Sequence, residues 1–313
     1  MKVKKPYFWD LKKPNILSYI LLPFTILISI NNILTSLIKK NKVNKDIKTI
    51  CVGNIYIGGT GKTPLVIKLS DILKKLNYKT GVVKKFYKDQ NDEQQLIRNK
   101  TKLYCFKKRK NALNRAIKDK IDVAIFDDGL QDRSINYNLK FVCFNRSKSI
   151  GNGFLIPAGP LREKIKSLKK YDAVFINGNK KKSENLKSLC RKYNSKIKIF
   201  EAYYRPTNIK SLNKRHTYLI FSGIGNPSSF RETVIENNLN IIKEIIFPDH
   251  YQYNKRDIKK IKSYAKNSGS KILTTEKDYS KLDKNDVKGI NYLSIDLFIK
   301  NENKFIKFIN SKI

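Results

Sequence analysis

The sequence predicts an α/β fold with a mostly parallel sheet, followed by a second, smaller α/β domain. Short apolar runs typical of buried strands alternate with stretches that carry apolar residues at helical spacing, such as 63–76. This alternation is typical of parallel sheets covered by helices on both faces. The pattern breaks near 204–206, and a shorter α/β pattern follows. The predicted strands are one beginning at Ile50, then 79–83, 121–126, 139–144, 173–176 and 197–202, and in the second part 218–221, 241–246 and 272–274.

The first strand runs into a glycine-rich turn that ends in Gly61-Lys62-Thr63. Such a turn cradles phosphates: successive N–H groups point into one concavity, the lysine reaches the outer phosphates and the threonine hydroxyl can ligate magnesium. The helix that follows adds its positive end. Tyr56 stands where the usual spacing has a glycine, and a turn that holds no phosphate is the alternative. The expected ATP-binding residues are Gly58, Gly59, Thr60, Gly61, Lys62 and Thr63.

Two adjacent carboxylates, Asp127 and Asp128, follow the apolar run 121–126. A strand that ends beside a phosphate loop can deliver carboxylate oxygens to Mg²⁺, which prefers oxygen ligands. Together with Thr63, this pair is the predicted metal site. The alternative is an Asp-Asp-Gly turn without a ligand.

Three further segments carry candidate chemistry with weaker signals. The polar stretch 91–94, interpreted as a loop after a strand, offers Asp92 as an acceptor for a hydroxyl proton, or else is a solvated acidic loop. His250, in Phe247-Pro-Asp-His250, could orient a carboxylate or belong to a capping turn. The glycine- and proline-rich loop 151–163 carries Arg162 and Glu163 and is either a fixed ligand surface or a structural loop.

The N-terminal stretch 15–38 contains no charged residue, and lysines flank it on both sides. It includes Pro23 and several polar residues, so it falls between a bilayer span and an amphipathic segment. An in-plane anchor is the favoured interpretation, with Phe8 and Trp9 at the membrane interface. A true span and a helix buried against the domain are the alternatives. The lysines expected to touch anionic headgroups are Lys4, Lys5, Lys12, Lys13, Lys39, Lys40 and Lys42.

The composition is strongly basic, with a formal net charge of +40 and a pI near 10.0. The basic residues are mostly lysine and are spread along the whole chain beside many Ile and Asn residues, which indicates a compositional bias. No basic run alternates with aromatic residues as a stacking groove requires, so nucleic acid is not an expected partner. The charge favours anionic partners such as nucleotides, phosphorylated lipids and an inner membrane surface.

The four cysteines, Cys51, Cys105, Cys143 and Cys190, form no C-x-x-C pair and are expected to be reduced core residues of a cytoplasmic protein. Only His216 and His250 could join them in a zinc site, so zinc is not expected.

These segments together resemble the tetraacyldisaccharide 4'-kinase family, the lipid A 4'-kinases of Gram-negative bacteria, from the N-terminal apolar stretch almost to the end of the chain. The irregular spacing around Tyr56 is itself a trait of that family. The matching stretches are Val52-Gly-Asn54, Gly58-Gly-Thr-Gly-Lys-Thr-Pro64, Asp92-Glu93, Asp127-Asp-Gly-Leu-Gln131, Gly151-Asn-Gly153, Pro157-Ala-Gly-Pro-Leu-Arg-Glu163, Gly223-Ile-Gly225, Phe247-Pro-Asp-His250 and Thr274-Thr-Glu-Lys-Asp278.

The resemblance implies ATP-dependent phosphorylation of the 4'-hydroxyl of tetraacyldisaccharide 1-phosphate, with Mg²⁺, to give lipid IVA in lipid A biosynthesis. It also implies a P-loop NTPase domain (41–205), a C-terminal α/β domain (206–313) and an N-terminal membrane-anchoring helix region (1–40) at the cytoplasmic face of the inner membrane. We expect a monomer that acts on a lipid disaccharide.

The resemblance also implies roles for individual residues. Asp92 would take the hydroxyl proton, with His250 of the other lobe as its partner, so that closure of the lobes would assemble the site. Lys62 would serve catalysis and the phosphates. The remaining roles implied are the metal and active-site network for Thr63, Asp127, Asp128 and Gln131, and the substrate cleft for Glu93, Arg162 and Glu163.

The chain departs from the family in two places. The family usually has histidine where Asp132 stands, and Ser-Arg-Gly-Tyr-Gly where this chain has Lys84-Lys-Phe-Tyr-Lys88. Those lysines keep positive charge in the segment and could replace the missing arginine. A different class, the partitioning and septum-placement ATPases, carries a second lysine just before the paired glycines; here that residue is Ile57, which argues against the class. A basic nucleic-acid-binding NTPase is a third interpretation that rests on charge alone.

Overall fold

The computed structural model describes residues 5–37, 47–132, 134–178 and 183–313. These residues form two compact units. Unit 1 consists of the described residues within 1–86, 100–203 and 298–313, and unit 2 of residues 87–99 and 204–297. The chain therefore passes between the units four times.

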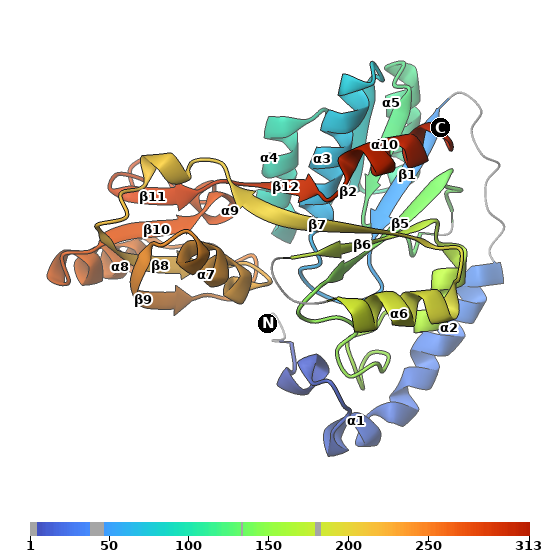
Figure 1. Cartoon of the computed structure of the whole chain (residues 1–313), viewed down its shortest axis with the longest axis horizontal. Coiled ribbons are helices and arrows are strands. Elements are labelled where there is room, and N and C mark those ends of the chain that lie inside the picture. Colours follow the sequence, from blue (N-terminus) through green and yellow to red (C-terminus); the bar gives the residue numbers. More distant parts are fainter. Residues whose placement is uncertain (1–4, 38–46, 133, 179–182) are drawn as a thin grey trace. The chain divides into compact units, whose positions relative to one another are not determined.

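Unit 1 is built on an eight-stranded sheet with the order β12-β7-β6-β5-β1-β4-β2-β3 (Figure 1). The strand pairs from β7 to β3 are parallel, which confirms the predicted sheet type. β1 lies between β4 and β5, so the loop after β1 opens where the strand order changes direction, the usual place for a ligand in such sheets. The strands are β1 (Lys48–Gly53), β2 (Thr80–Lys85), β3 (Leu103–Phe106), β4 (Val123–Asp127), β5 (Leu139–Asn145), β6 (Ala173–Asn177), β7 (Lys198–Pro206) and β12 (Ile295–Ile299).

Helices cover both faces of this sheet (Figure 1). Buried residues of α5 and α6 join one core with alternate residues of the central strands. On the opposite face Phe305 of α10 packs against the rings of Phe141 and Phe175, and α10 is joined to α3 by an ion pair of 2.8 Å between Lys68 and Glu302. The helices are α3 (Lys62–Lys75), α5 (Arg109–Lys118), the 3₁₀ helix η4 (Ile165–Lys170), α6 (Glu184–Tyr193) and α10 (Glu302–Asn310).

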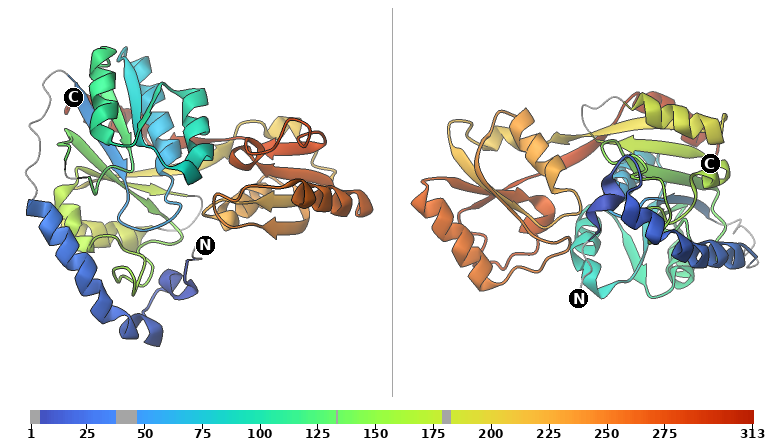
Figure 2. Two further views of the ribbon diagram at one scale, coloured as in Figure 1. Left: turned by 180° about the vertical axis from the view of Figure 1, so that it is seen from behind. Right: turned by 90° about the horizontal axis from the view of Figure 1, so that it is seen from below.

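The N-terminal stretch is a series of short helices at the margin of unit 1 (Figure 2). They are η1 (Tyr7–Asp10), α1 (Ile16–Ile20), η2 (Leu22–Phe24) and α2 (Thr25–Leu37). No helix within the described part of the chain is both long enough and apolar enough to cross a bilayer. Apolar side chains of α1 and α2 stay exposed, among them Ile16, Ile20, Ile26, Leu27, Ile33 and Leu34. Lys4, Lys39, Lys40 and Lys42, predicted to meet headgroups, lie outside the described residues.

Phe8 and Trp9 are buried, so the prediction that both lie at a membrane interface is wrong for this structure. Trp9 Nε1 donates to Pro157 O (2.9 Å), and Asn152 Nδ2 donates to Ser18 Oγ (3.0 Å). Gly151 has a φ of +60°, and a Cβ there would lie 2.2 Å from the Trp9 carbonyl oxygen, so only glycine allows the approach. The glycine- and proline-rich loop 151–163 is thus the docking surface of the N-terminal segment.

Unit 2 contains a four-stranded parallel sheet with the order β11-β10-β8-β9. Alternate residues of β8 point to opposite faces: Tyr218 and Ile220 pack with α7, and Leu219 and Phe221 pack with α8. The elements are η3 (Lys88–Gln90), α4 (Asn91–Lys100), η5 (Ile209–Ser211), β8 (Thr217–Ser222), α7 (Pro227–Glu236), β9 (Asn240–Ile246), α8 (Lys255–Asn267), β10 (Lys271–Thr275), α9 (Glu276–Tyr279) and β11 (Ile290–Leu293).

The units differ from the predicted domains in two segments. The predicted boundary after residue 205 lies close to the observed crossing at 203–204, but residues 87–99 group with unit 2 and the C-terminal helix α10 with unit 1. An amphipathic pattern predicts that a helix exists without specifying the sheet that receives its apolar face. The stretch 91–94, predicted as a loop, is the first turn of α4.

Candidate active site

The glycine-rich turn joins β1 to α3 at the carboxyl end of the central strand of unit 1. Gly58 and Gly61 both have positive φ, of 110° and 80°, and Gly61 is the residue that precedes α3. A side chain is strained in this backbone conformation, which explains glycine at both positions. Lys62 and Thr63 are the first two residues of α3, so the turn leads directly to the positive end of the helix.

Two asparagine side chains donate hydrogen bonds to this turn. Asn54 Nδ2 donates to Thr60 Oγ1 (3.1 Å) and to Gly58 O (3.3 Å), and Asn177 Nδ2 donates to Thr60 O (2.7 Å). Both side chains are buried. Asn54 belongs to a matched motif but had no predicted role, and Asn177 was missed. The available signal was a polar residue at the carboxyl end of an apolar strand, β6.

Tyr56 is buried beside the turn, at the position where the usual spacing has a glycine. Its hydroxyl donates to Asp10 and accepts from Lys5, residues of the N-terminal segment. Burial together with the Asp10 carboxylate raises the pKa of Tyr56 far above its ordinary value, so the hydroxyl keeps its proton. Tyr56, the residue that makes the spacing irregular, therefore connects the phosphate loop to the N-terminal segment.

Asp127, the last residue of β4, is buried and faces Thr63 and Lys84. Its Oδ2 accepts from Lys84 Nζ (2.6 Å) and from Thr63 Oγ1 (3.4 Å). Its Oδ1 is buried and has no hydrogen-bond partner within the described residues. A buried acceptor without a donor is costly unless a cation or water occupies it, so this atom suits a metal site. No cluster of three Asp, Glu, His or Cys side chains that could hold a metal occurs in the described ranges, so the phosphates of a nucleotide would have to complete the coordination.

Asp128 follows with a φ of +58° and makes ion pairs. Arg162 Nη1 donates to both of its carboxylate oxygens (3.0 and 3.1 Å), and Lys62 Nζ lies 3.9 Å from Oδ1. Burial alone would raise the pKa of Asp128, but the charges of Lys62 and Arg162 outweigh it and hold the pKa below its ordinary value. Asp128 therefore holds the side chains of Lys62 and Arg162 through ion pairs.

Gln131 and the buried Glu163 form a hydrogen-bond network next to Asp128. Gln131 Nε2 donates to Glu163 Oε1 (2.9 Å) and to Asn54 O (3.1 Å), and the Tyr171 hydroxyl donates to Glu163 Oε2 (3.0 Å). Glu163 is only 4% exposed. Both oxygens of this predicted cleft residue are therefore bound within the protein, so Glu163 supports the loop rather than facing a cleft.

The two departures from the family motifs both form ion pairs in unit 1. Asp132 lies 3.4 Å from Arg109 Nη1, and Arg109 Nη2 also donates to Asp128 O (2.6 Å). Lys84 pairs with Asp127 as described above. Sequence reasoning did not identify Arg109, because nothing in its surroundings on α5 distinguishes it from the other basic residues of the chain.

Unit 2 contains the second group of predicted residues. Asp92, in the first turn of α4, accepts from His250 Nδ1 at 3.0 Å (Oδ1) and 3.1 Å (Oδ2). His250 lies in the loop after β9 with a φ of +58°. The predicted partnership is thus present, but both residues belong to unit 2, so the expectation that they come from different lobes is wrong.

Two lysines of the Thr274–Asp278 motif region surround the same carboxylate. Lys277 Nζ lies 3.3 Å and Lys281 Nζ 3.5 Å from Asp92 Oδ2. Burial would raise the pKa of Asp92, but the hydrogen bond from His250 and the charges of both lysines outweigh it and hold the pKa well below its ordinary value. Asp92 is therefore ionised at neutral pH. The motif contains Lys277, and Lys281 follows it by three residues; neither lysine had a predicted role.

Acidic residues around Lys277 complete this cluster. Lys277 Nζ lies 3.5 Å from Glu93 and 3.6 Å from Asp249. Burial would lower the pKa of Lys277, but the charges of Glu93, Asp249 and Asp92 outweigh it and raise the pKa. Glu93, predicted as a substrate residue, thus stands beside Asp92 in a cluster of alternating charges.

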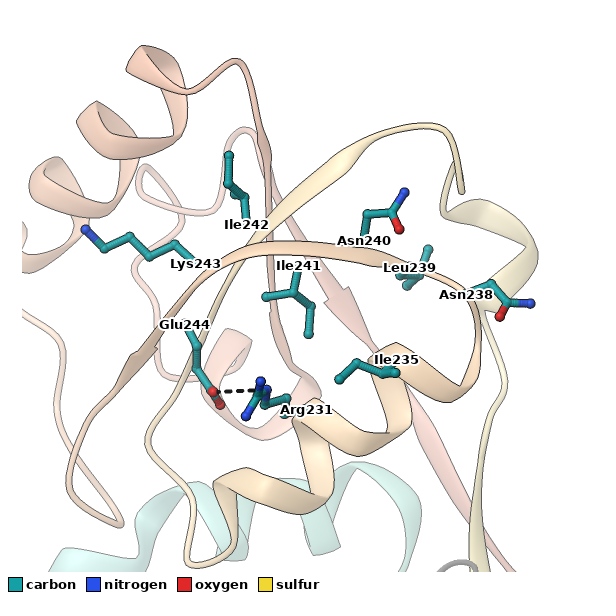
Figure 3. Close-up of a pocket in the computed structure, with 9 residues that line it drawn as sticks. All are labelled: Arg231, Ile235, Asn238, Leu239, Asn240, Ile241, Ile242, Lys243 and Glu244. Atoms are coloured by element: carbon teal, nitrogen blue, oxygen red, sulfur yellow. Dashed lines mark ion pairs between the residues drawn. The ribbon is translucent and has the colours of Figure 1, made fainter.

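A shallow pocket of about 590 Å³ in unit 2 lies apart from these residues. Figure 3 shows its lining by α7 and β9, including the ion pair between Arg231 and Glu244 (3.7 Å). None of the predicted site residues contributes to its lining.

The doubly covered parallel sheet of unit 1, with a glycine-rich Gly-Lys-Thr turn after the central strand and a carboxylate at the end of the neighbouring strand, defines a protein of the P-loop NTPase class. The family model described as tetraacyldisaccharide-1-P 4'-kinase matches residues 15–313. The chain belongs to this family, and it is a kinase.

Individual relatives agree with this assignment. The chain is 48% identical over 317 residues to a tetraacyldisaccharide 4'-kinase of Pelagibacter ubique (strain HTCC1062), with all of both chains covered. It is 34% identical over 332 residues to the protein of the same name from Rickettsia canadensis (strain McKiel), covering all of this chain and 97% of the relative. Among solved structures, LpxK from Aquifex aeolicus, crystallised in complex with ATP, matches with a TM-score of 0.69 at 23% identity, over 95% of this chain and 99% of that one. This last likeness concerns the fold.

Proposed function

We propose that this protein transfers the γ-phosphoryl group of ATP to the 4'-hydroxyl of tetraacyldisaccharide 1-phosphate, giving lipid IVA in lipid A biosynthesis. The observation that carries the proposal is the buried, ionised carboxylate of Asp92, paired with His250 in a chain that also carries a phosphate loop. A switch that only hydrolyses its nucleotide needs no carboxylate–histidine pair to accept a proton from an acceptor hydroxyl.

The nucleotide is assigned to the loop Gly58–Thr63. Its N–H groups and the positive end of α3 would hold the phosphates, and Lys62 would neutralise charge that develops on the transferred group. Asp128 and Arg162 would keep Lys62 in place through their ion pairs. The proposed reaction breaks the bond between the γ-phosphorus and the β–γ bridging oxygen and forms a bond from the γ-phosphorus to the 4'-oxygen.

Mg²⁺ is assigned to Thr63 and Asp127, with Asp128 nearby. Two oxygen atoms suit this cation: the buried Asp127 Oδ1, which has no hydrogen-bond partner among the described residues, and the adjacent Thr63 hydroxyl. When bound, Mg²⁺ supplies charge neutralisation on the phosphate oxygens.

Asp92 would accept the proton that leaves the 4'-hydroxyl. Its lowered pKa makes it a weak base, which suits a phosphoryl transfer in which the hydroxyl proton becomes acidic only as the new bond forms. His250 would orient the carboxylate through Nδ1. Lys277 and Lys281 would hold the carboxylate ionised before the substrate arrives.

The lipid acceptor is assigned to the cytoplasmic face of the inner membrane, where the protein would act as a monomer without nucleic acid. Support comes from the exposed apolar side chains of α1 and α2, beside the exposed Lys12 and Lys13. Such a segment can lie in the plane of a membrane surface and contact anionic headgroups with its lysines.

The direct test is a transfer assay with purified protein, ATP, Mg²⁺ and tetraacyldisaccharide 1-phosphate. Wild-type protein should phosphorylate the lipid, and Asp92→Ala should lower kcat by about 10²-fold or more because the proton acceptor is lost. Asp119→Ala is the matched control, since Asp119 is a surface carboxylate paired with Lys102 and Arg115.

Normal turnover by Asp92→Ala would show that Asp92 is not the base. ATP hydrolysis stimulated by DNA or by self-assembly, without transfer to the lipid, would overturn the kinase function and favour one of the other two classes considered from the sequence.

A further inference from the structure

Lys84 is a buried lysine at the carboxyl end of β2, in the strand next to the one that carries Asp127. The sheet register pairs Lys84 directly with Asp127. Lys84 is only 4% exposed, and its Nζ lies 2.6 Å from Asp127 Oδ2. A buried ammonium group is costly without a partner, so this ion pair is a defining contact of the site.

The pair divides the two oxygens of Asp127 into different environments. Oδ2 accepts from both Lys84 and Thr63, while Oδ1 is buried and has no hydrogen-bond partner in the described part of the chain. Lys84 thus contacts a carboxylate beside the phosphate loop whose other oxygen is buried and has no hydrogen-bond partner among the described residues.

The charge at position 84 distinguishes this chain from the motif it resembles. The neighbouring Lys85 is on the same strand, but successive side chains of a strand point to opposite faces, so its charge does not share this contact.

We propose that Lys84 is a positioning residue that reserves Asp127 Oδ2, leaves only Oδ1 to the divalent cation of the nucleotide site, and thereby weakens binding of that cation. This inference rests on the proposed function. A fixed ammonium and a divalent cation on the same carboxylate repel each other at short range in a poorly solvated site. In return, Lys84 holds the Asp127 carboxylate in place when no cation is bound.

The test is a titration of Mn²⁺ into the full-length protein saturated with a non-hydrolysable ATP analogue, followed by electron paramagnetic resonance or calorimetry. Lys84→Ser should bind Mn²⁺ about 10-fold more tightly than wild type, because the competing charge is removed. Lys84→Arg keeps the charge and should retain the weak affinity. Lys85→Ser makes the same charge change one residue along and should leave the Mn²⁺ affinity unchanged.

Melting temperatures provide a second readout that does not depend on turnover. Without cation, Lys84→Ser leaves the buried Asp127 carboxylate without its cationic partner, so the Tm of this variant should fall by about 5 °C or more. Mn²⁺ with the analogue should then raise its Tm by more than it raises that of wild type. If Lys84→Ser does not fold, Lys84→Gln serves instead, since its neutral amide can still donate to Asp127.

Unchanged or weaker Mn²⁺ binding by the neutral variants would overturn the inference. Equal tightening in Lys85→Ser would also overturn it, because the effect would then come from net charge. If wild type binds neither Mn²⁺ nor the analogue, the proposed function fails instead.

Discussion

Asp92 shows how a single side chain acquires its properties from partners distant in the sequence. His250, Lys277 and Lys281 all contact its carboxylate, from a loop after β9 and from the region of α9. Because the hydrogen bond from His250 and the charges of the two lysines outweigh burial, the pKa of Asp92 in the folded protein lies below its ordinary value of 3.8. A depressed carboxyl pKa contributes stability that is fully present above the unfolded pKa and is lost as the pH falls through the folded one.

Asp92→Asn should therefore destabilise the protein most at neutral pH and progressively less in acid. We expect a free energy of unfolding lower by about 1–3 kcal/mol at pH 7, because Lys277 and Lys281 lose a buried counter-charge. The difference from wild type should shrink as the pH falls below about 4, because the carboxyl group of the unfolded wild-type chain then takes up a proton while that of the folded protein stays ionised. Urea unfolding of the variant and of wild type at several pH values measures this difference in the free energy of unfolding.

Asp249→Asn is the control, because Asp249 is 40% exposed and should change stability by less than about 0.5 kcal/mol. A deficit in Asp92→Asn that stays constant down to pH 3 would show that the carboxylate charge does not stabilise the cluster.

At the scale of elements, loop 151–163 and the N-terminal segment form one packed structure. Trp9 is buried against this loop and donates to Pro157 O, while Asn152 donates to Phe8 O, Ser18 Oγ and Ala158 O. The same segment reaches the phosphate loop through Asp10 and Tyr56. The loop that the sequence offered as a ligand surface is thus at least in part a structural one.

The position of Trp9 can be tested by fluorescence, since it is the only tryptophan of the 313 residues. Anionic vesicles that contain brominated lipids should leave its emission unquenched, because its ring is buried in protein. The double variant Trp9→Phe/Tyr19→Trp moves the probe to α1, where Tyr19 is 57% exposed, and should be quenched by the same vesicles. Quenching of wild-type Trp9 would restore the interfacial position expected from the sequence.

For the whole molecule, a net charge of +40 and a group of exposed apolar side chains are two different means of binding a lipid surface. Charge alone attracts any anionic surface and is screened by salt, whereas apolar side chains that enter the lipid keep their effect in salt. Exposed apolar side chains lie together on α1 and α2, and under the proposed function they would distinguish membrane binding from general electrostatic attraction.

Replacing Ile26, Leu27 and Ile30 by serine should lower binding to anionic vesicles at least about 10-fold at 0.5 M salt, because three side chains that would be buried in lipid are lost. Co-sedimentation measures the bound fraction. Ile242→Ser is the matched control, since Ile242 is 53% exposed on β9 and should leave binding unchanged. Equal binding by the triple variant would mean that lysines alone hold the protein at the membrane.

Sequence patterns predicted strands well where the strands are buried on both faces. β1, β4, β5 and β6 are almost entirely buried and lie at or within two residues of the predicted positions. β3, β11 and β12 are short and partly exposed, so their pattern is indistinct and they were not predicted. α4 was not predicted either, because its polar sequence has too few apolar residues to show helical spacing.

The sequence by itself determined the phosphate loop, the parallel sheet and the family, because glycine geometry, apolar runs and ordered motifs are local properties of the chain. Only the tertiary structure decided that Lys84 pairs with Asp127, that Lys277 and Lys281 surround Asp92, and that Asp92 and His250 belong to one unit. The physical reason is that a charge receives its partner from strands and helices brought together by the fold. In a chain with 66 lysines and arginines, no local pattern indicates which of them will be buried.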